Sequence, residues 1–186
     1  MVLLESEMVA LGSGAHDFSL MGIDEVEHPL SDWADKEVLV MVFMCNHCPY
    51  VQAVWDRLNK LQSRFEGRGV QLIGVNPNAA NPNYPDDSFE EMKKAPKLFG
   101  MNFPYLIDED QSVSRAYRAV CTPDIFVYDK ERKLVYRGRI DDNWQDAGAA
   151  QSNELADSLE AILSGEEVSN EQKPAMGCSI KWTSTW

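Results

Sequence analysis

The chain has 186 residues, of which 44% are hydrophobic and 10% aromatic, and its formal net charge is −13. This length and composition predict one packed globular domain rather than a disordered chain. Because nucleic acids and anionic membranes bind positive surfaces, the acidic balance argues against both as partners. No segment approaches the roughly 20 apolar residues of a membrane span, and the acidic start lacks the pattern of a signal peptide. We therefore expect a cytoplasmic protein.

Strand-like and helix-like segments alternate along the chain. In chain order, the predicted elements are a short edge strand at 17–24, a buried strand at 37–44, a helix from Pro49, a strand at 70–76, a loop at 77–87, a helix at 88–100 that Pro96 kinks or ends, a strand at 103–108, a helix at 111–120, a hairpin of strands at 122–129 and 133–140, and a last helix at 153–165. The run at 37–44 is continuous and Val-rich, which is typical of a strand buried on both faces. Apolar residues recur at helical spacing after Pro49, which indicates an amphipathic helix.

A strand–helix–strand start followed by an antiparallel hairpin predicts an α/β fold with an open sheet. We find no internal repeat, so 1–186 is predicted to be a single domain with a core at about 17–165 and a C-terminal tail at 166–186. In open α/β sheets, reactive groups usually lie at the carboxyl end of a central strand, where a helix begins. The buried strand at 37–44 ends at such a place, just before two cysteines.

These cysteines, Cys45 and Cys48, form the sequence CNHC at the start of the predicted helix. A helix N-terminus offers unpaired N–H groups and a partial positive charge, which make a thiol easier to ionise. We expect Cys45 to be the more exposed thiol, to have a pKa in the range of about 3.5–7.5, and to attack a partner disulfide. The more buried Cys48 would resolve the mixed disulfide, and a cationic His47 would stabilise the thiolate. Such a couple carries two electrons itself, so we expect no separate cofactor.

Other interpretations of the cysteines are weaker. A zinc knuckle needs a second pair of ligands at short spacing, and the remaining cysteines and histidines are scattered singly, so we predict no metal. Cys121 is interpreted first as a small core residue and second as an auxiliary thiol. Cys178 lies in a tail that Ile180 and Trp182 would hold to the domain. Its first interpretation is an unreactive, partly buried thiol, and its second is a third redox partner that resolves or guards Cys45.

Three motifs follow one another along the chain. CNHC comes after a central strand and opens a helix, and then GVN, a polar insertion and FPYLID follow in that order. Finally, VCTPDIFVYD places Thr122 and Pro123 just before a strand. Together they resemble the thioredoxin-like superfamily, on the branch that peroxiredoxin-like (AhpC/TSA-type) proteins share with membrane-anchored thiol–disulfide oxidoreductases. The resemblance covers 18–165, and MGCSIKW is similar to the tail of a peroxiredoxin-like subgroup.

The resemblance implies a thioredoxin-like fold, in which helices flank a central mixed sheet, with an extra N-terminal strand, an insertion and a C-terminal tail. It also implies that Pro123 is cis and packs against the turn of Cys45 and Cys48, and that the Thr122 backbone offers pairing groups to an extended partner. A thiol–disulfide oxidoreductase of this kind would act on protein or small-molecule disulfides or thiols, with an electron donor that the sequence does not identify. The direction of electron transfer and the oligomeric state stay open.

Two alternative functions also stay open. A peroxiredoxin-like thiol peroxidase would use Cys48, which stands in a Cys-Pro pair as in those enzymes. That mechanism also needs a hydroxyl residue three positions earlier and an arginine on a later strand, where this chain has Cys45 and Pro123. The other alternative is a non-catalytic thioredoxin-like binding module. Leu39 and Val51 occupy the positions where related proteins carry a proton-accepting acid, so the proton acceptor for Cys48 is unassigned.

Overall fold

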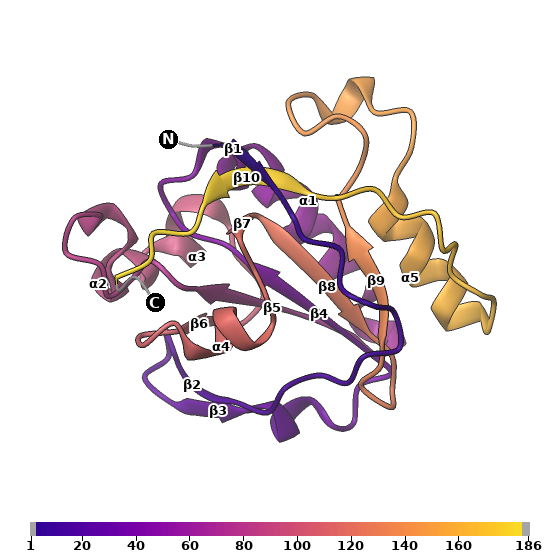
Figure 1. Cartoon of the computed structure of the whole chain (residues 1–186), viewed down its shortest axis with the longest axis horizontal. Helices are drawn as coiled ribbons and strands as arrows, with labels where there is room; N and C mark the ends of the chain where they lie inside the picture. Colours follow the sequence, from indigo (N-terminus) through magenta and orange to yellow (C-terminus); the bar gives the residue numbers. More distant parts are fainter. Residues whose placement is uncertain (1–2, 184–186) are drawn as a thin grey trace.

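The computed structural model describes residues 3–183, and its centre is a seven-stranded sheet with helices on both faces (Figure 1). The strands of this sheet are β2 (Ser19–Gly22), β3 (Glu27–Pro29), β4 (Val38–Phe43), β5 (Val70–Asn76), β6 (Tyr105–Ile107), β8 (Asp124–Tyr128) and β9 (Leu134–Gly138). Their spatial order is β3-β2-β6-β5-β4-β8-β9. Strand β4 pairs in parallel with β5 and antiparallel with β8, which confirms the predicted mixed sheet.

Two longer helices cover one face of this sheet, and shorter elements cover the other. The helices are α1 (Pro49–Phe65), α2 (Phe89–Met92), α3 (Ala95–Phe99), α4 (Ser112–Ala116) and α5 (Glu154–Ser164), and short 3-10 turns are η1 (Leu30–Trp33), η2 (Glu66–Arg68), η3 (Pro85–Asp87) and η4 (Ala147–Ala149). Helices α1 and α5 pack on one face, while α4 and the segment around β2 pack on the other. Within residues 3–183, no helix combines the length and the apolar character needed to cross a membrane.

Strand β4 lies in the middle of the core because all of its residues are buried. Successive side chains of a strand point to opposite faces of the sheet. Those that pack with α1 and α5 are Val38, Val40 and Val42, and those that pack with α4 are Leu39, Met41 and Phe43. Packing on both sides fixes where the strand ends, and therefore where the CNHC turn begins.

A second sheet brings the two ends of the described chain together. It consists of β1 (Leu3–Glu5), β10 (Met176–Ser179) and β7 (Cys121–Thr122), with β10 in the middle. In Figure 1 the yellow tail runs back across the molecule, so that β10 lies beside the indigo β1 and close to β7. The sequence did not predict this strand. Ile180 is buried and Trp182 packs against the same part of the core, so both hold the tail as predicted.

Three elements differ from the sequence-based prediction. The strand predicted at 17–24 is not at the edge of the sheet, because β3 pairs along its outer side. The helix predicted at 88–100 is divided into α2 and α3, with Pro96 in the first turn of α3, where a proline is tolerated. The helix predicted at 111–120 ends early, because Arg118 has a left-handed backbone conformation with φ of 57°.

Candidate active site

The CNHC turn lies between β4 and α1, against the strand that precedes Pro123. Cys48 is the N-cap residue of α1, and Pro49 takes the first helical position. The Cys48 thiol donates a hydrogen bond to the carbonyl oxygen of Thr122 at 3.0 Å, and Cys45 Sγ lies 3.6 Å from Thr122 Oγ1. The peptide bond between Thr122 and Pro123 is cis. The fold thus brings both cysteines against one residue, Thr122.

Both thiols are fully buried. The expectation that Cys45 is the more exposed of the two is therefore wrong. Strand β7 covers the turn, and β10 in turn pairs with β7, so the tail adds a layer that the sequence did not predict. The two sulfur atoms differ instead in their hydrogen bonds and in their distance from the start of α1.

The pKa values of the two thiols are shifted in opposite directions. Burial, reinforced by the hydrogen bond and charge of Cys48, raises the pKa of Cys45 well above its usual value. The pKa of Cys48 is lowered to about 5, chiefly by hydrogen bonding from the Cys45 thiol and further by Thr122 and the backbone N–H of Val51. The expected low pKa at Cys45 is therefore wrong. Of the two thiols, Cys48 is therefore the one that ionises more easily.

His47 lies beside Cys45 and is held by a buried carboxylate from the insertion. His47 Nδ1 lies 3.8 Å from Cys45 Sγ and donates a hydrogen bond to Asp87 Oδ2. This hydrogen bond and the charge of Asp87 raise the pKa of His47. Burial alone would raise the pKa of Asp87, but hydrogen bonds from His47 and Asn78 hold that pKa below its usual value. A hydrogen-bonded pair of His47 and the Asp87 carboxylate therefore stands next to the Cys45 sulfur.

Asp87 is the site residue that sequence analysis missed. Besides His47 Nδ1, it accepts hydrogen bonds from the backbone N–H groups of Asn46 at 2.7 Å and His47 at 3.0 Å, and from Asn78 Nδ2 at 3.2 Å. These donors fix the insertion at 77–87 to the CNHC turn. An acidic residue in a Pro- and Asn-rich loop has no diagnostic spacing. The one available signal was the length of the loop itself, since long loops in compact domains are often functional.

Cys45, His47 and Asp87 also bring together three possible metal ligands, whose atoms lie within 4.8 Å of one another. In the observed geometry, however, His47 Nδ1 is bonded to one Asp87 oxygen, and backbone N–H groups occupy the other. Hydrogen bonding therefore accounts for the cluster. The absence of a metal stays a prediction from the sequence.

The two remaining cysteines lie near the same strand in different settings. Cys121 is buried on β7, where burial raises its pKa strongly, in keeping with a core residue. Cys178 lies on β10 directly opposite Thr122 in the sheet. Burial raises the pKa of Cys178 to about 12, and the hydrogen bond and charge of Cys48 add to the effect. The tail therefore places its thiol in the same buried cluster as Cys45 and Cys48.

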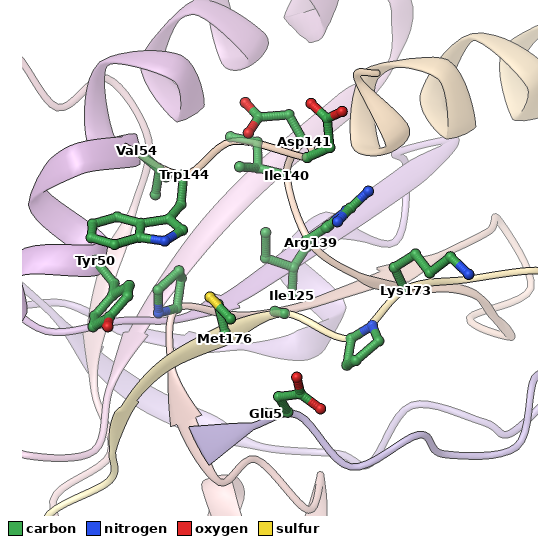
Figure 2. A pocket seen from close by; sticks show the side chains of 14 residues that line it. Glu5, Tyr50, Val54, Ile125, Arg139, Ile140, Asp141, Trp144, Lys173 and Met176 are labelled. Atoms are coloured by element: carbon green, nitrogen blue, oxygen red, sulfur yellow. The ribbon is translucent and has the colours of Figure 1, made fainter. Parts of the chain in front are cut away.

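A cavity of about 470 Å³ opens beside Pro123 and the first turn of α1 (Figure 2). Tyr50 and Val54 of α1, Pro123, and Met176 of β10 form an apolar wall. The Trp144 ring lies 4.2 Å from that of Tyr50 and completes this wall. Charged side chains around the rest of the cavity are Glu5, Arg139, Asp141, Asp142 and Lys173. The cavity therefore joins the first turn of α1, the cis-proline and the tail.

The sequence was compared with known protein families and curated proteins. A model described as the AhpC/TSA family matches residues 11–137. Thiol-disulfide oxidoreductase ResA of Geobacillus thermodenitrificans is 30% identical over 130 residues, which cover 70% of this chain and 70% of the relative. The putative peroxiredoxin bcp of Helicobacter pylori is 27% identical over 113 residues, which cover 61% of this chain and 68% of the relative.

Solved structures agree with these matches. An uncharacterized conserved protein from Geobacillus kaustophilus superposes with a TM-score of 0.94 at 40% identity, covering 100% of this chain and 99% of the other. The thioredoxin domain of a thiol-disulfide oxidoreductase from Bacteroides vulgatus gives a TM-score of 0.60 at 22% identity, covering 70% and 89%. The predicted thioredoxin-like fold and the predicted class of oxidoreductase are thus confirmed. The chain belongs to the AhpC/TSA family.

Proposed function

We propose that the protein exchanges disulfides through a redox couple formed by Cys45 and Cys48. The observation that carries this proposal is a pair of buried thiols at the start of α1, both placed against Thr122, the residue before Pro123. The thiolate is the nucleophile in disulfide exchange, and a pKa of about 5 keeps Cys48 ionised at neutral pH. The substrates are thiols or disulfides.

In the proposed sequence of steps, the Cys48 thiolate attacks a partner disulfide and releases one partner sulfur. Forming the mixed disulfide removes the negative charge of Cys48, which had raised the pKa of Cys45. The His47 imidazolium, 3.8 Å away, then favours the Cys45 thiolate. Cys45 attacks the Cys48 sulfur and releases the second partner sulfur, so the partner gains two electrons and the couple becomes a disulfide. This order reverses the one expected from sequence, because Cys48 has the lowered pKa.

The cavity shown in Figure 2 is the proposed entrance for the substrate. It adjoins Pro123 and the first turn of α1, and its volume of about 470 Å³ lies within the range of about 300–1,000 Å³ typical of ligand pockets. The wall of Tyr50 and Trp144 fits an apolar group next to Pro123. Either a small disulfide or one side chain of a protein partner could enter it.

The experiment that tests the couple is a redox equilibrium of the purified protein against glutathione. Cys45 and Cys48 share the tryptic peptide 37–57, so their disulfide is seen directly as the loss of two hydrogens from that peptide. We expect a two-electron midpoint within the range of about −270 to −120 mV known for the fold. The midpoint should disappear in Cys48→Ser and stay in Cys121→Ser. A wild-type protein with no such midpoint would contradict the proposal.

A thiol peroxidase is the second candidate, because Cys48 is a thiolate followed by Pro49 and a putative peroxiredoxin is among the relatives. In residues 3–183, no lysine or arginine donates a hydrogen bond to Cys48. Arg137 is instead buried in an ion pair with Asp124, at 3.0 Å. Disulfide exchange is therefore preferred. Oxidation of Cys48 by hydrogen peroxide faster than by oxidised glutathione would reverse this preference, and inert thiols would favour a non-catalytic binding module.

We also propose that the protein works in the cytoplasm. The cytoplasm keeps thiols reduced, so a couple working there begins each cycle as a dithiol.

A further inference from the structure

We propose that Cys178 is a third redox thiol, which takes over the disulfide from Cys45 and forms a bond with Cys48 that ties the tail to the active-site turn. The inference deepens the proposed function and depends on the couple of Cys45 and Cys48. It follows from the position of β10, which pairs with Thr122, the residue before the cis-proline Pro123. An extended partner would pair with Thr122 at the same place.

The first argument is the register of the tail. Cys178 lies directly opposite Thr122, the residue whose carbonyl oxygen accepts the hydrogen bond of the Cys48 thiol at 3.0 Å. The two thiols therefore approach the same residue, Cys48 from the turn and Cys178 from β10. Cys48 is among the groups that raise the pKa of Cys178, and Cys178 is among those that lower the pKa of Cys48. Both thiols also belong to the same buried cluster of the core.

The second argument is that β10 lies so close to β7 that position 177 must be a glycine. A Cβ atom on Gly177 would lie 1.9 Å from the carbonyl oxygen of Thr122 and 2.5 Å from its carbonyl carbon. Only glycine allows β10 to come this close to β7. A tail that simply covered a core would not need such an approach, whereas a tail that delivers the next residue, Cys178, to the turn does.

The third argument is that β10 is fixed on both sides of Cys178. Before it, Ser6 N–H donates to the carbonyl oxygen of Ala175 at 2.8 Å, and the Ala175 N–H donates to Ser6 Oγ at 2.9 Å. After it, the Lys181 N–H donates to Asn78 Oδ1 at 2.9 Å, and Asn81 Nδ2 donates to the Lys181 carbonyl oxygen at 3.0 Å. These bonds hold the thiol in place.

The pairing of β10 with β7 also explains what a thiol at position 178 would do. With β10 in place, the backbone groups of Thr122 are taken by the protein's own tail. The expected pairing of Thr122 with an extended partner therefore requires the tail to leave. Met176 is two residues before Cys178 and so shares its face of the strand, and Met176 lines the cavity in Figure 2. The cavity thus lies against the strand that carries Cys178.

The chemical step is an internal exchange. The Cys178 sulfur attacks Cys48 Sγ, a Cys48–Cys178 bond forms, and the bond from Cys48 to Cys45 breaks. The electron pair of that bond goes to Cys45 Sγ, and the proton lost by Cys178 is taken up there, because burial raises the pKa of Cys45. The two oxidising equivalents taken from the substrate are conserved, so no further oxidant is needed.

The test uses the full-length protein equilibrated with oxidised glutathione, acid-quenched and digested with trypsin without reduction. Cys48 lies in peptide 37–57 and Cys178 in peptide 140–181, because the bond after Lys173 precedes a proline and is not cut. We expect Cys45→Ser to give the cross-link between these two peptides as its main oxidised product. Adding Cys178→Ser should abolish the cross-link.

Cys121 supplies the matched control, because it is a buried thiol on β7 next to Thr122. Cys45→Ser with Cys121→Ser should keep the cross-link. If Cys45→Ser does not fold, the comparison is made on wild type, where a fraction of the cross-link is expected and is lost in Cys178→Ser. The role of Cys178 is overturned, and the proposed function is not, if wild type forms the disulfide inside peptide 37–57 but neither wild type nor Cys45→Ser forms the cross-link. Wild type with neither disulfide overturns the proposed function.

Discussion

At the scale of single residues, Cys45 and Cys48 show how position decides the chemistry of identical side chains. Cys48 is the N-cap residue of α1 and its pKa is lowered, whereas burial raises the pKa of Cys45. His47 and Asp87 stand on the other side of Cys45. Protonated His47 provides a positive charge beside Cys45 once Cys48 has reacted, whereas the negative charge of Asp87 raises the pKa of Cys45. The charges of Cys48, Cys45 and His47 therefore depend on one another.

The first prediction concerns the origin of the low pKa. Ultraviolet thiolate absorbance of the reduced protein should titrate with a midpoint of about 5, assigned to Cys48. Cys45→Ala removes the largest cause of the shift and should raise the midpoint by about one to two pH units, the equivalent of about 1.5–3 kcal/mol for a hydrogen bond to a charged group. Cys121→Ala should leave it in place. An unchanged midpoint in Cys45→Ala would assign the shift to the helix N-terminus instead.

The second prediction concerns the pair of His47 and Asp87. The raised pKa of His47 stabilises the fold at pH values below the usual histidine pKa of about 6.5, and this contribution is lost as pH rises through the raised value. The lowered pKa of Asp87 adds stability above its usual value of 3.8, which is lost as pH falls through the lowered one. Asp87→Asn should therefore destabilise the reduced protein by about 3 kcal/mol near pH 6, and by clearly less near pH 9.

Urea unfolding at both pH values measures this effect. Asp86→Asn is the matched control, because Asp86 uses its backbone carbonyl oxygen to hold Asn46 and its side chain is exposed. That variant should change stability by less than about 0.5 kcal/mol at both pH values. A loss in Asp87→Asn that does not depend on pH would show that Asp87 acts through its backbone N–H partners and not through His47.

At the scale of elements, the insertion and the tail depend on each other. Asn78 donates to Asp87, which holds the CNHC turn, and accepts from the backbone of Lys181 in the tail. One side chain therefore links the groups beside Cys45 with the strand that carries Cys178. The sequence predicted the insertion as a loop and 166–186 as a tail, but their hydrogen bonds join residues about 100 positions apart in the chain, which no local pattern contains.

The third prediction tests the fit of β10 on β7. Gly177→Ala should force the two strands apart, because its Cβ would overlap the carbonyl group of Thr122. We expect a loss of about 1–3 kcal/mol for the overpacked site, and opening of the tail should raise the rate of Cys48 alkylation by iodoacetamide about tenfold or more. Mass spectrometry of peptide 37–57 follows the rate. Gly67→Ala, where a Cβ meets no atom within 4 Å, should alkylate like wild type.

The opposite result would also be informative. If Gly177→Ala is alkylated at the wild-type rate, reagents reach Cys48 without movement of β10. The cavity beside Tyr50 and Trp144 would then be a sufficient route to the buried couple, and the tail would not limit access to it.

At the scale of the whole molecule, the fold was predictable where signals are local. Continuous apolar runs located β4 and β5, helical spacing located α1 and α5, and the hairpin of β8 and β9 followed from two short strands around a turn. Cys45, Cys48 and Pro123 were found because each belongs to a short motif. Strand β10 and Asp87 were not found, because their roles come from partners that only the folded chain brings near.

The last prediction follows from the chain length between the thiols. A disulfide between Cys48 and Cys178 closes a loop of about 130 residues, which in the loop-entropy model destabilises the unfolded chain by roughly 5 kcal/mol. A disulfide between Cys45 and Cys48 closes only the four residues of CNHC, and the same model gives roughly 2 kcal/mol. Oxidised Cys45→Ser should therefore gain more stability over its reduced form than oxidised wild type gains, as measured by urea unfolding.

Strain and residual structure often reduce such gains, so the decisive quantity is the difference between matched proteins rather than the absolute value. Cys45→Ser with Cys178→Ser can form neither disulfide and should unfold at the same urea concentration with and without oxidant. If oxidation stabilises Cys45→Ser by no more than this double variant, the tail is not tied to the turn. If it stabilises by several kcal/mol, oxidation of the couple locks β10 over Thr122, and the redox state of Cys48 sets how firmly the tail covers the site.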